Sequence, residues 1–295
     1  MKKFSIIIPT LNSPTLRHTV ESLANLDVDP QHFEVIVVGM DDFSAIEKDY
    51  PFPLTILKTD RPYAPAEARN LGARQAAGEI LVFLDSDCLP TTNWLSLFEK
   101  IFMDSRISAA GGGVRFDRKN YWNAADNFSI FHEFLDTHQP GFRDALPSLN
   151  LAIRKSVFQK QGGFNEGYPD AAGEDFEFTR RINQGGDLLF FTPEAWIFHN
   201  SSRKSFEKVW KHSVKMGKFS TKLHMPGKKS IPAWARNRVI LFLAGPLIAL
   251  LALLNIYLTT PKSLQFLLYL PVVYLQKIAW VFGAVQSPWL KQRGG

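Results

Sequence analysis

The apolar run at 79–84 ends directly on two carboxylates, Asp85 and Asp87. A run of this length and composition predicts a buried strand. Because open α/β sheets bind ligands at the carboxyl ends of their strands, we expect these aspartates at a binding edge. Carboxylates one residue apart suit Mg²⁺ or Mn²⁺ that carries substrate phosphates. A solvated Asp-Ser-Asp turn is the alternative for these three residues alone, and the surrounding sequence favours the metal site.

Strand-like and helix-like segments alternate on both sides of this run. Short apolar runs predict strands, and apolar residues at helical spacing predict helices. Strands are expected at 4–8, 33–38, 54–57, 79–84, 107–114, 150–154 and 188–191, and helices at 15–26, 64–77, 92–102, 120–136, 155–161 and 175–184. This order predicts an α/β fold with a doubly wound, mostly parallel sheet, as in Rossmann-like nucleotide-binding domains. The glycines at 111–113 lack the Lys-Ser or Lys-Thr of a phosphate loop, so they predict a bulge or a close backbone approach.

Charge and cysteine content narrow the possible classes of protein. The chain has 295 residues, a net charge of +6 and a single cysteine, Cys88. One cysteine excludes an internal disulfide framework and is compatible with a reducing compartment. The basic excess is concentrated at 208–238, which indicates either a nucleic-acid or a membrane-surface patch. The patch lacks a nucleic-acid motif and adjoins an apolar segment, so we expect a membrane and no nucleic acid.

The C-terminal part is long and apolar enough to suggest membrane-spanning helices. No charged residue occurs from 239 to 261, and a second apolar stretch from 264 to about 286 is interrupted only by Lys277. About 20 apolar residues cross a bilayer core, and basic flanks at both outer ends predict a hairpin with both ends cytoplasmic. Lys277 leaves three readings of the second stretch open: snorkelling, a polar groove, or an interfacial helix. A buried helical hairpin of a soluble protein is a further alternative.

These observations predict two parts. Residues 1–225 would form the catalytic domain, and residues 226–295 the basic juxtamembrane segment with helices at about 239–260 and 264–286. The apolar run after Lys2 and Lys3 is too short for a signal peptide. We therefore expect the protein at the inner (cytoplasmic) membrane, with its catalytic domain in the cytoplasm.

Six motifs in order resemble those of family-2 glycosyltransferases, which have the GT-A fold. They are Ser5-Ile6-Ile7-Ile8-Pro9-Thr10-Leu11-Asn12, Ala68-Arg69-Asn70-Leu71-Gly72-Ala73, Asp85-Ser86-Asp87, Asn150-Leu151-Ala152-Ile153-Arg154, Gly162-Gly163-Phe164-Asn165-Glu166 and Gly173-Glu174-Asp175. Each motif is weak by itself, but six in register over most of residues 4–200 are specific. The resemblance implies a nucleotide-diphosphate sugar as donor and Mg²⁺ or Mn²⁺ as cofactor.

The resemblance also implies roles for individual residues. Asp87 would bind the metal, and Asp85 would lie near the ribose or orient a metal-bound water. Asp175 would be the general base of an inverting transfer, with Glu174 as the second choice for the base or as a group that binds the acceptor. Arg69 would pair with a sheet-edge carboxylate or with the diphosphate. His199 would reach the metal or the diphosphate, unless it is a satisfied core or surface histidine.

Two departures from the family pattern affect specificity. The aspartate that reads the nucleobase usually follows the second strand at once, whereas here Gly39 and Met40 intervene before Asp41 and Asp42. Asp41 is the first candidate for this role and Asp42 the second, and Pro9 at the end of the first strand is also assigned to the nucleotide site. The Gln-x-x-Arg-Trp signature of processive synthases is absent from the sequence, which favours transfer of one sugar.

The sequence therefore predicts a membrane-anchored, metal-dependent, inverting glycosyltransferase. Its acceptor would be a lipid-linked sugar or a saccharide presented at the cytoplasmic face of the membrane. The alternative is a non-catalytic, membrane-anchored sugar-nucleotide binding or scaffold protein, which only the displaced second-strand aspartate supports.

Overall fold

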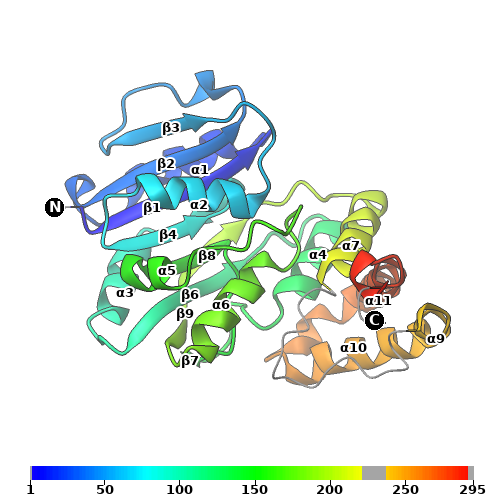
Figure 1. Cartoon of the computed structure of the whole chain (residues 1–295). Helices are drawn as coiled ribbons and strands as arrows, with labels where there is room; N and C mark the ends of the chain where they lie inside the picture. The colour runs from blue at the N-terminus through cyan, green and yellow to red at the C-terminus, as the bar shows by residue number, and fades with distance from the viewer. Residues whose placement is uncertain (1, 221–236, 292–295) are drawn as a thin grey trace. The chain divides into compact units, whose positions relative to one another are not determined.

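The computed structural model describes residues 2–220 and 237–291, and these residues belong to two compact units (Figure 1). Unit 1 comprises Met1–Arg115 and Phe134–Asn200, and unit 2 comprises Phe116–Glu133 and Ser201–Gly295. The chain therefore enters unit 2 at residue 116, returns to unit 1 at residue 134 and enters unit 2 again after residue 200. The expected boundary at 225/226 lies outside the described residues.

A nine-stranded sheet forms the centre of unit 1, in the order β3-β2-β1-β4-β8-β6-β9-β5 with β7 paired to β9. Its strands are β1 (Phe4–Leu11), β2 (Phe33–Met40), β3 (Leu54–Lys58), β4 (Ile80–Leu84), β5 (Cys88–Pro90), β6 (Ile107–Arg115), β7 (Gly141–Phe142), β8 (Asn150–Arg154) and β9 (Leu188–His199). The side chains of Ile6, Ile7 and Ile8 on β1 are fully buried. Burial on both faces explains why these strands are continuous apolar runs rather than alternating ones.

The α/β class and the doubly wound arrangement are confirmed, but the sheet is mixed rather than mostly parallel. Strands β3, β2, β1 and β4 are mutually parallel, whereas β8 runs antiparallel to both of its neighbours, β4 and β6. Strand β9 is parallel to β6, and the short strands β5 and β7 are antiparallel to β9. Strand direction here depends on the side from which the chain re-enters the sheet, which apolar periodicity does not report.

Helices and short 3₁₀ segments complete unit 1. They are α1 (Leu16–Ser22), η1 (Leu23–Asn25), η2 (Pro30–His32), η3 (Phe43–Ala45), α2 (Pro65–Gln75), α3 (Trp94–Ile101), α5 (Lys155–Lys160) and α6 (Glu174–Gln184). Small residues let α2 lie close to the sheet: a Cβ on Gly72 would meet the Ile7 side chain at 2.6 Å. This close fit fixes the position of α2, which carries Arg69 into the site described below.

The glycine run in β6 makes the expected close backbone approach. A Cβ on Gly112 would lie 1.9 Å from the carbonyl oxygen of Ala195 on β9, and the β6–β9 register shifts between Gly112 and Val114. The Asn150 side-chain amide donates to the carbonyls of Gly113 and Ala195 at 3.1 and 2.9 Å. The bulge thus lets β9 continue beyond its predicted end at residue 191, as far as His199.

Unit 2 is helical. Its elements are α4 (Tyr121–Phe131), α7 (Phe206–Ser220), α9 (Arg238–Leu243), α10 (Gly245–Thr259), η5 (Ser263–Tyr269), α11 (Leu270–Val285) and η6 (Pro288–Lys291). Helices α7 and α11 meet backbone to backbone, because a Cβ on Gly217 would lie 1.8 Å from the carbonyl oxygen of Trp280. Among the described residues, one helical segment, Ser263–Val285, is long and apolar enough to cross a membrane, whereas Gly245–Thr259 has only 15 residues. The expected transmembrane hairpin is therefore not shown.

Candidate active site

Arg69 joins the two acidic clusters at the carboxyl edge of the sheet. Its guanidinium donates from Nη2 to Asp85 Oδ1 at 2.7 Å and from Nη1 to Glu174 Oε1 at 2.9 Å. Arg69 and Glu174 are each 3% exposed. Asp85 and Glu174, which are almost ninety residues apart in the sequence, are thus held in one site by a single guanidinium. Of the two partners that the sequence left open for Arg69, the structure contains the sheet-edge carboxylate.

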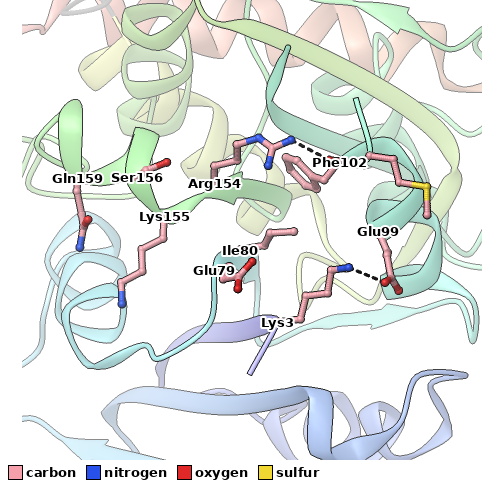
Figure 2. Close-up of a pocket in the computed structure, with 10 residues that line it drawn as sticks. Lys3, Glu79, Ile80, Glu99, Phe102, Arg154, Lys155, Ser156 and Gln159 are labelled. Carbon is pink, nitrogen blue, oxygen red and sulfur yellow. Dashed lines mark hydrogen bonds and ion pairs between the residues drawn. The ribbon is translucent and has the colours of Figure 1, made fainter. Parts of the chain in front are cut away.

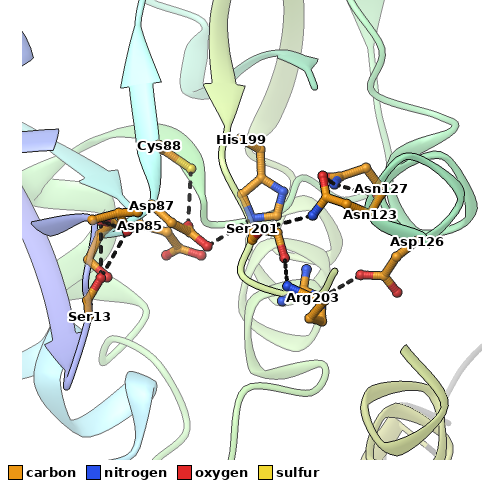
Figure 3. Close-up of polar contacts among 12 residues, drawn as sticks. Ser13, Asp85, Asp87, Cys88, Asn123, Asp126, Asn127, His199, Ser201 and Arg203 are labelled. Atoms are coloured by element: carbon orange, nitrogen blue, oxygen red, sulfur yellow. Dashed lines mark hydrogen bonds and ion pairs between the residues drawn. The ribbon is translucent and has the colours of Figure 1, made fainter. Parts of the chain in front are cut away.

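Asp87 and His199 lie together on the neighbouring side of this edge. Asp87 Oδ2 is 3.3 Å from His199 Nε2, and the Asn200 amide donates to the Asp87 carbonyl at 2.8 Å. The pairing of β5 with β9 sets Cys88 opposite His199 and so carries the imidazole to the carboxylate (Figure 3). The strand β5, which the sequence did not reveal, is therefore the element that assembles this pair.

The chemistry of this donor set fits a divalent cation. Ligand atoms of Asp87, Cys88 and His199 all lie within 4.8 Å of one another. Burial raises the pKa of the Cys88 thiol well above its ordinary value, so the sulfur stays protonated at neutral pH. A carboxylate oxygen and an imidazole nitrogen remain as ligands, and substrate phosphates and water commonly supply the rest for Mg²⁺ or Mn²⁺.

Hydroxyl groups hold the turn between the two aspartates. The Ser86 carbonyl accepts hydrogen bonds from Ser13 Oγ at 3.3 Å, Thr15 Oγ1 at 3.0 Å and Thr19 Oγ1 at 2.9 Å. These donors come from the segment after β1 and from α1, so the first strand and helix position the Asp-Ser-Asp turn. Sequence reasoning missed them, because isolated Ser and Thr residues near a helix start are ordinarily capping residues.

Glu174 and Asp175 begin α6, directly after Gly173, whose φ of 98° is a left-handed conformation that glycine adopts without strain. Glu174 Oε2 accepts from the Ala172 amide at 2.9 Å, and Asp175 Oδ2 accepts from the Ser148 amide at 3.1 Å. Burial and the neighbouring Asp175 raise the pKa of Glu174 to about 7, against the opposing effect of Arg69. Burial also raises the pKa of Asp175 above its ordinary value. Raised carboxyl pKa values suit proton transfer near neutral pH.

A cavity of about 390 Å³ opens beside Arg69 and the Asp-Ser-Asp turn. Pro9, Arg69, Asp85 and Asp87 line it, together with the segments at 62–65 and 169–171. Tyr63, which also lines this cavity, is an aromatic residue for which the sequence provided no functional signal. Pro9 and both aspartates of the Asp-Ser-Asp turn thus share one concave space of a size that suits a small-molecule ligand.

The two candidates for nucleobase recognition differ in environment. Asp41 Oδ1 accepts from the Ser13 amide at 2.7 Å, and its Oδ2 is buried with no hydrogen-bond partner among the described residues. Asp42 is exposed, and its side chain caps η3 by accepting from the Ser44 amide at 3.0 Å. Asp42 therefore has a local structural role, whereas Asp41 retains an unsatisfied acceptor.

A larger cavity of about 490 Å³ lies at the opposite edge of the sheet, where β1 and β4 begin (Figure 2). Several of its charged groups have partners: Lys3 pairs with Glu99 at 2.6 Å, and Lys155 Nζ donates to the Ala76 carbonyl at 2.6 Å. Arg154 donates to backbone carbonyls, including that of Phe102 at 2.8 Å. This cavity lies at the other edge of the sheet from Asp85, Asp87 and Glu174, so it is not assigned to the site.

A family model described as glycosyl transferase family 2 matches residues 5–162, which is more than half of the chain. The chain belongs to glycosyl transferase family 2. It is therefore an enzyme of the glycosyltransferase class. The match covers β1, α2 and the Asp-Ser-Asp turn.

Curated relatives of this family-2 glycosyltransferase carry consistent names. "Glycosyltransferase AglE" of Haloferax volcanii is 26% identical over 234 residues, which cover 77% of this chain and 76% of that protein. The "pre-mycofactocin glycosyltransferase" of Mycobacterium tuberculosis is 27% identical over 214 residues, which cover 66% of this chain and 42% of that protein. The chain thus spans most of the first relative but less than half of the second.

Solved structures confirm the GT-A fold. The mannosyltransferase PcManGT from Pyrobaculum calidifontis, in complex with GDP-Man and Mn²⁺, superposes with a TM-score of 0.65 at 19% identity, over 98% of this chain and 88% of that chain. Residues 1–349 of S. aureus TarS in complex with UDP-GlcNAc superpose with a TM-score of 0.55 at 18% identity, over 96% of this chain and 90% of that chain. At these identities the likeness concerns the fold.

Proposed function

We propose that this family-2 glycosyltransferase transfers one sugar, with inversion, from a nucleotide-diphosphate sugar to a lipid-linked or saccharide acceptor at the cytoplasmic face of the membrane. The observation that carries the proposal is the Arg69 bridge between Asp85 and Glu174. This bridge supports the proposal because it joins Asp85, which is expected near the donor, to Glu174, which directly precedes the expected base Asp175.

The donor would occupy the 390 Å³ cavity. Asp41 offers a buried, unpartnered carboxylate oxygen for an N–H group of a nucleobase. Asp87 and His199 would hold a divalent cation, which supplies Lewis-acid stabilisation of the diphosphate leaving group. Two of the structural neighbours are complexes with Mn²⁺, namely PcManGT and GalNAc-T7, which supports Mn²⁺ or the similar Mg²⁺ as cofactor.

Asp175 would accept the proton of the acceptor hydroxyl. The Ser148 amide holds one of its oxygens at 3.1 Å, and the Phe176 amide holds the other at 2.8 Å, so the carboxylate has a fixed orientation. Its raised pKa makes it a stronger base than an exposed aspartate. Glu174 would position Arg69 and hold negative charge beside the base.

The acceptor side of the proposal depends on the apolar C-terminal helices. The candidate spanning segment Ser263–Val285 supports association with a membrane, and therefore an acceptor displayed at its surface. The missing Gln-x-x-Arg-Trp signature favours one transfer per acceptor rather than polymerisation.

A screen of nucleotide sugars, read by release of nucleoside diphosphate with Mn²⁺ present, tests the proposal. One donor should support turnover, and Asp175→Asn and Asp87→Ala should each lower the rate by at least about a thousandfold while the protein stays folded. Asp104→Asn, a carboxylate at the opposite edge of the sheet, is the matched control and should retain the full rate. Donor binding without turnover by the wild type would instead support the non-catalytic binding protein.

A further inference from the structure

Unit 2 exposes an unusually apolar set of side chains. On α10, five leucines are between 43% and 82% exposed, and on α9 Leu243 is 72% exposed. The leucines of α10 are Leu247, Leu250, Leu251, Leu254 and Leu258. Clustered exposed leucines on consecutive helices are rare on monomeric soluble proteins and mark an interaction surface.

Helix α10 has two different apolar faces. Gly245, Ala249, Leu253 and Ile256 recur at helical spacing and are buried within unit 2. The exposed leucines occupy five of the other positions, and the exposed polar residues Asn255 and Thr259 lie near the C-terminal end, so most of the circumference of α10 is hydrophobic. A helix whose faces are both apolar is stable only where both are shielded from water. Unit 2 covers only one face of α10.

Polar contacts within unit 2 hold α11, the helix that contributes most to the candidate spanning segment. Gln276 Nε2 donates to Asp126 Oδ1 of α4 at 2.7 Å, and Gln276 is 3% exposed. Lys277 Nζ donates to the Ser129 carbonyl of α4 at 3.3 Å. On its other flank a Cβ at Gly283 would lie 1.9 Å from the Val214 carbonyl of α7. Helix α11 is therefore packed against two helices that carry many polar and charged residues.

These two helices are unsuited to a bilayer core. Asp126 on α4 is fully buried and pairs with Arg203, as Figure 3 shows. It also pairs with His212. Helix α7 carries four lysines and one glutamate along 15 residues. To span a membrane, α11 would have to carry these groups into hydrocarbon or break its contacts with them, and both are costly.

Helices α9 and α10 do not provide a partner span. At 1.5 Å per residue, the 15 residues of α10 measure about 22 Å, which is short of the ~30 Å hydrocarbon core. Pro246 follows the break between α9 and α10, and Figure 1 shows the two helices running in different directions. In the same view α10 lies across the page and α11 is seen end-on, so the two do not form an antiparallel hairpin.

Charge identifies the partner of the exposed face. From residue 237 to 291 the sequence contains four basic residues and no aspartate or glutamate. Lys277 is held by the Ser129 carbonyl of α4, whereas Arg238 begins α9 and Lys262 lies in the connection between α10 and η5. Basic residues next to an apolar surface attract anionic lipid headgroups, whereas a protein partner of mixed charge would be matched by charges of both signs.

Segment η5 exposes leucines too, since Leu264 is 77% and Leu268 71% exposed. We propose that α9, α10 and η5 lie in the plane of an anionic membrane surface, with the exposed leucines among the acyl chains, and that unit 2 does not cross the bilayer. The attachment is monotopic, and α11 is a core helix of unit 2. This inference stands apart from the sugar chemistry of unit 1, so its failure would leave the proposed reaction intact.

Single-cysteine labelling tests the topology of the full-length protein. The native Cys88 is fully buried, so the wild type supplies a low background. Lys262→Cys marks the connection between α10 and η5, and Met103→Cys, at a residue 78% exposed in unit 1, marks the catalytic side. In right-side-out vesicles an impermeant maleimide should label neither variant, and both should react once detergent is added.

A spanning hairpin gives a different result. It would place residue 262 on the opposite side of the membrane from residue 103, so Lys262→Cys would react in intact right-side-out vesicles while Met103→Cys would not. That pattern would overturn the proposal.

Vesicle flotation tests the leucine face directly. Leu251→Glu and Leu258→Glu should each lower binding of the purified protein to phosphatidylglycerol vesicles by about tenfold or more, because each places a carboxylate among acyl chains. Met103→Glu is the matched control and should bind like the wild type. Wild-type binding to neutral phosphatidylcholine vesicles should be weaker than to phosphatidylglycerol.

Two outcomes of the flotation experiment would contradict the proposal. One is unchanged binding by both leucine variants. The other is a wild-type protein that does not float but forms a dimer in sedimentation, with the dimer lost in Leu258→Glu. That result would assign the face to a second copy of the chain. Circular dichroism and nucleotide binding confirm that the variants are folded.

Discussion

Arg69 is the residue that most tightly constrains the site, because one buried guanidinium serves two carboxylates. Replacing it with lysine keeps the charge but provides a single ammonium that cannot bridge Asp85 and Glu174 in the same geometry. We expect Arg69→Lys to lower kcat by about a hundredfold, since small misplacements of reacting groups have effects of this order.

Measuring kcat and KM of Arg69→Lys separately shows whether Arg69 positions the reacting groups. A lower kcat in a variant that is still folded would indicate positioning. Arg61→Lys, in an exposed pair with Glu67, is the matched control and should leave kcat unchanged. Wild-type kcat in Arg69→Lys would show that the bridge is not needed to align the site.

The acidic pair that begins α6 predicts the pH dependence of transfer. A protonated carboxyl cannot accept the acceptor's proton, so the rate should rise as pH increases through the pKa of the base. Burial raises the pKa of Asp175 above its ordinary value and, with Asp175 as neighbour, raises that of Glu174 to about 7. We therefore expect the acid limb of kcat to extend from the usual carboxyl range up to about pH 7.

Initial rates at saturating donor across pH provide the measurement. Glu174→Gln removes the neighbouring negative charge and should move the limb to lower pH. A rate that stays constant down to pH about 4, the range of an ordinary carboxyl, would argue against a buried carboxylate as base.

At the scale of elements, the pairing of β6 with β9 determines the position of His199, the last residue of β9. A methyl group at Gly112 would lie 1.9 Å from the Ala195 carbonyl, so the two strands would have to separate. We expect Gly112→Ala to lower the free energy of unfolding by about 3 kcal/mol, the upper part of the range for overpacking. Chemical denaturation would measure it.

Gly162→Ala is the matched control for this prediction. Its φ is +73°, but nothing lies within 4 Å of the position of a Cβ, so only backbone strain of about 1 kcal/mol is expected. Equal losses in the two variants would mean that the close approach of β6 and β9 does not limit stability.

For the whole molecule, donor and metal binding should stabilise the folded chain together. If Asp87 and His199 hold the cation that binds the diphosphate, a nucleoside diphosphate should raise the melting temperature much more with Mn²⁺ than with EDTA. At ligand concentrations about a hundredfold above Kd, linkage corresponds to about 2.7 kcal/mol.

Thermal melts of wild type and Asp87→Asn provide this comparison. The variant should lose the additional shift due to Mn²⁺ and keep the stability of its unliganded form. An identical nucleotide effect with Mn²⁺ and with EDTA would remove the cation from the proposed site.

The sequence by itself determined the family, the α/β class and most strands and helices of unit 1. Apolar runs and helical spacing are local patterns, and the Asp-Ser-Asp and Glu-Asp motifs carry their chemistry in adjacent residues. Asn70, which belongs to the Ala68–Ala73 motif, holds the segment at 162–166, because its amide donates to the Phe164 carbonyl at 2.8 Å.

Only the tertiary structure decided how distant residues combine. The antiparallel direction of β8, the short strand β5 that brings Cys88 opposite His199, and the Arg69 bridge all depend on pairing between segments far apart in the chain. The apolar C-terminal stretches were predicted to be membrane spans because mean hydropathy depends only on the residues along the chain. Whether a helix faces lipid or protein depends on its neighbours in space, and for α11 those neighbours are α4 and α7.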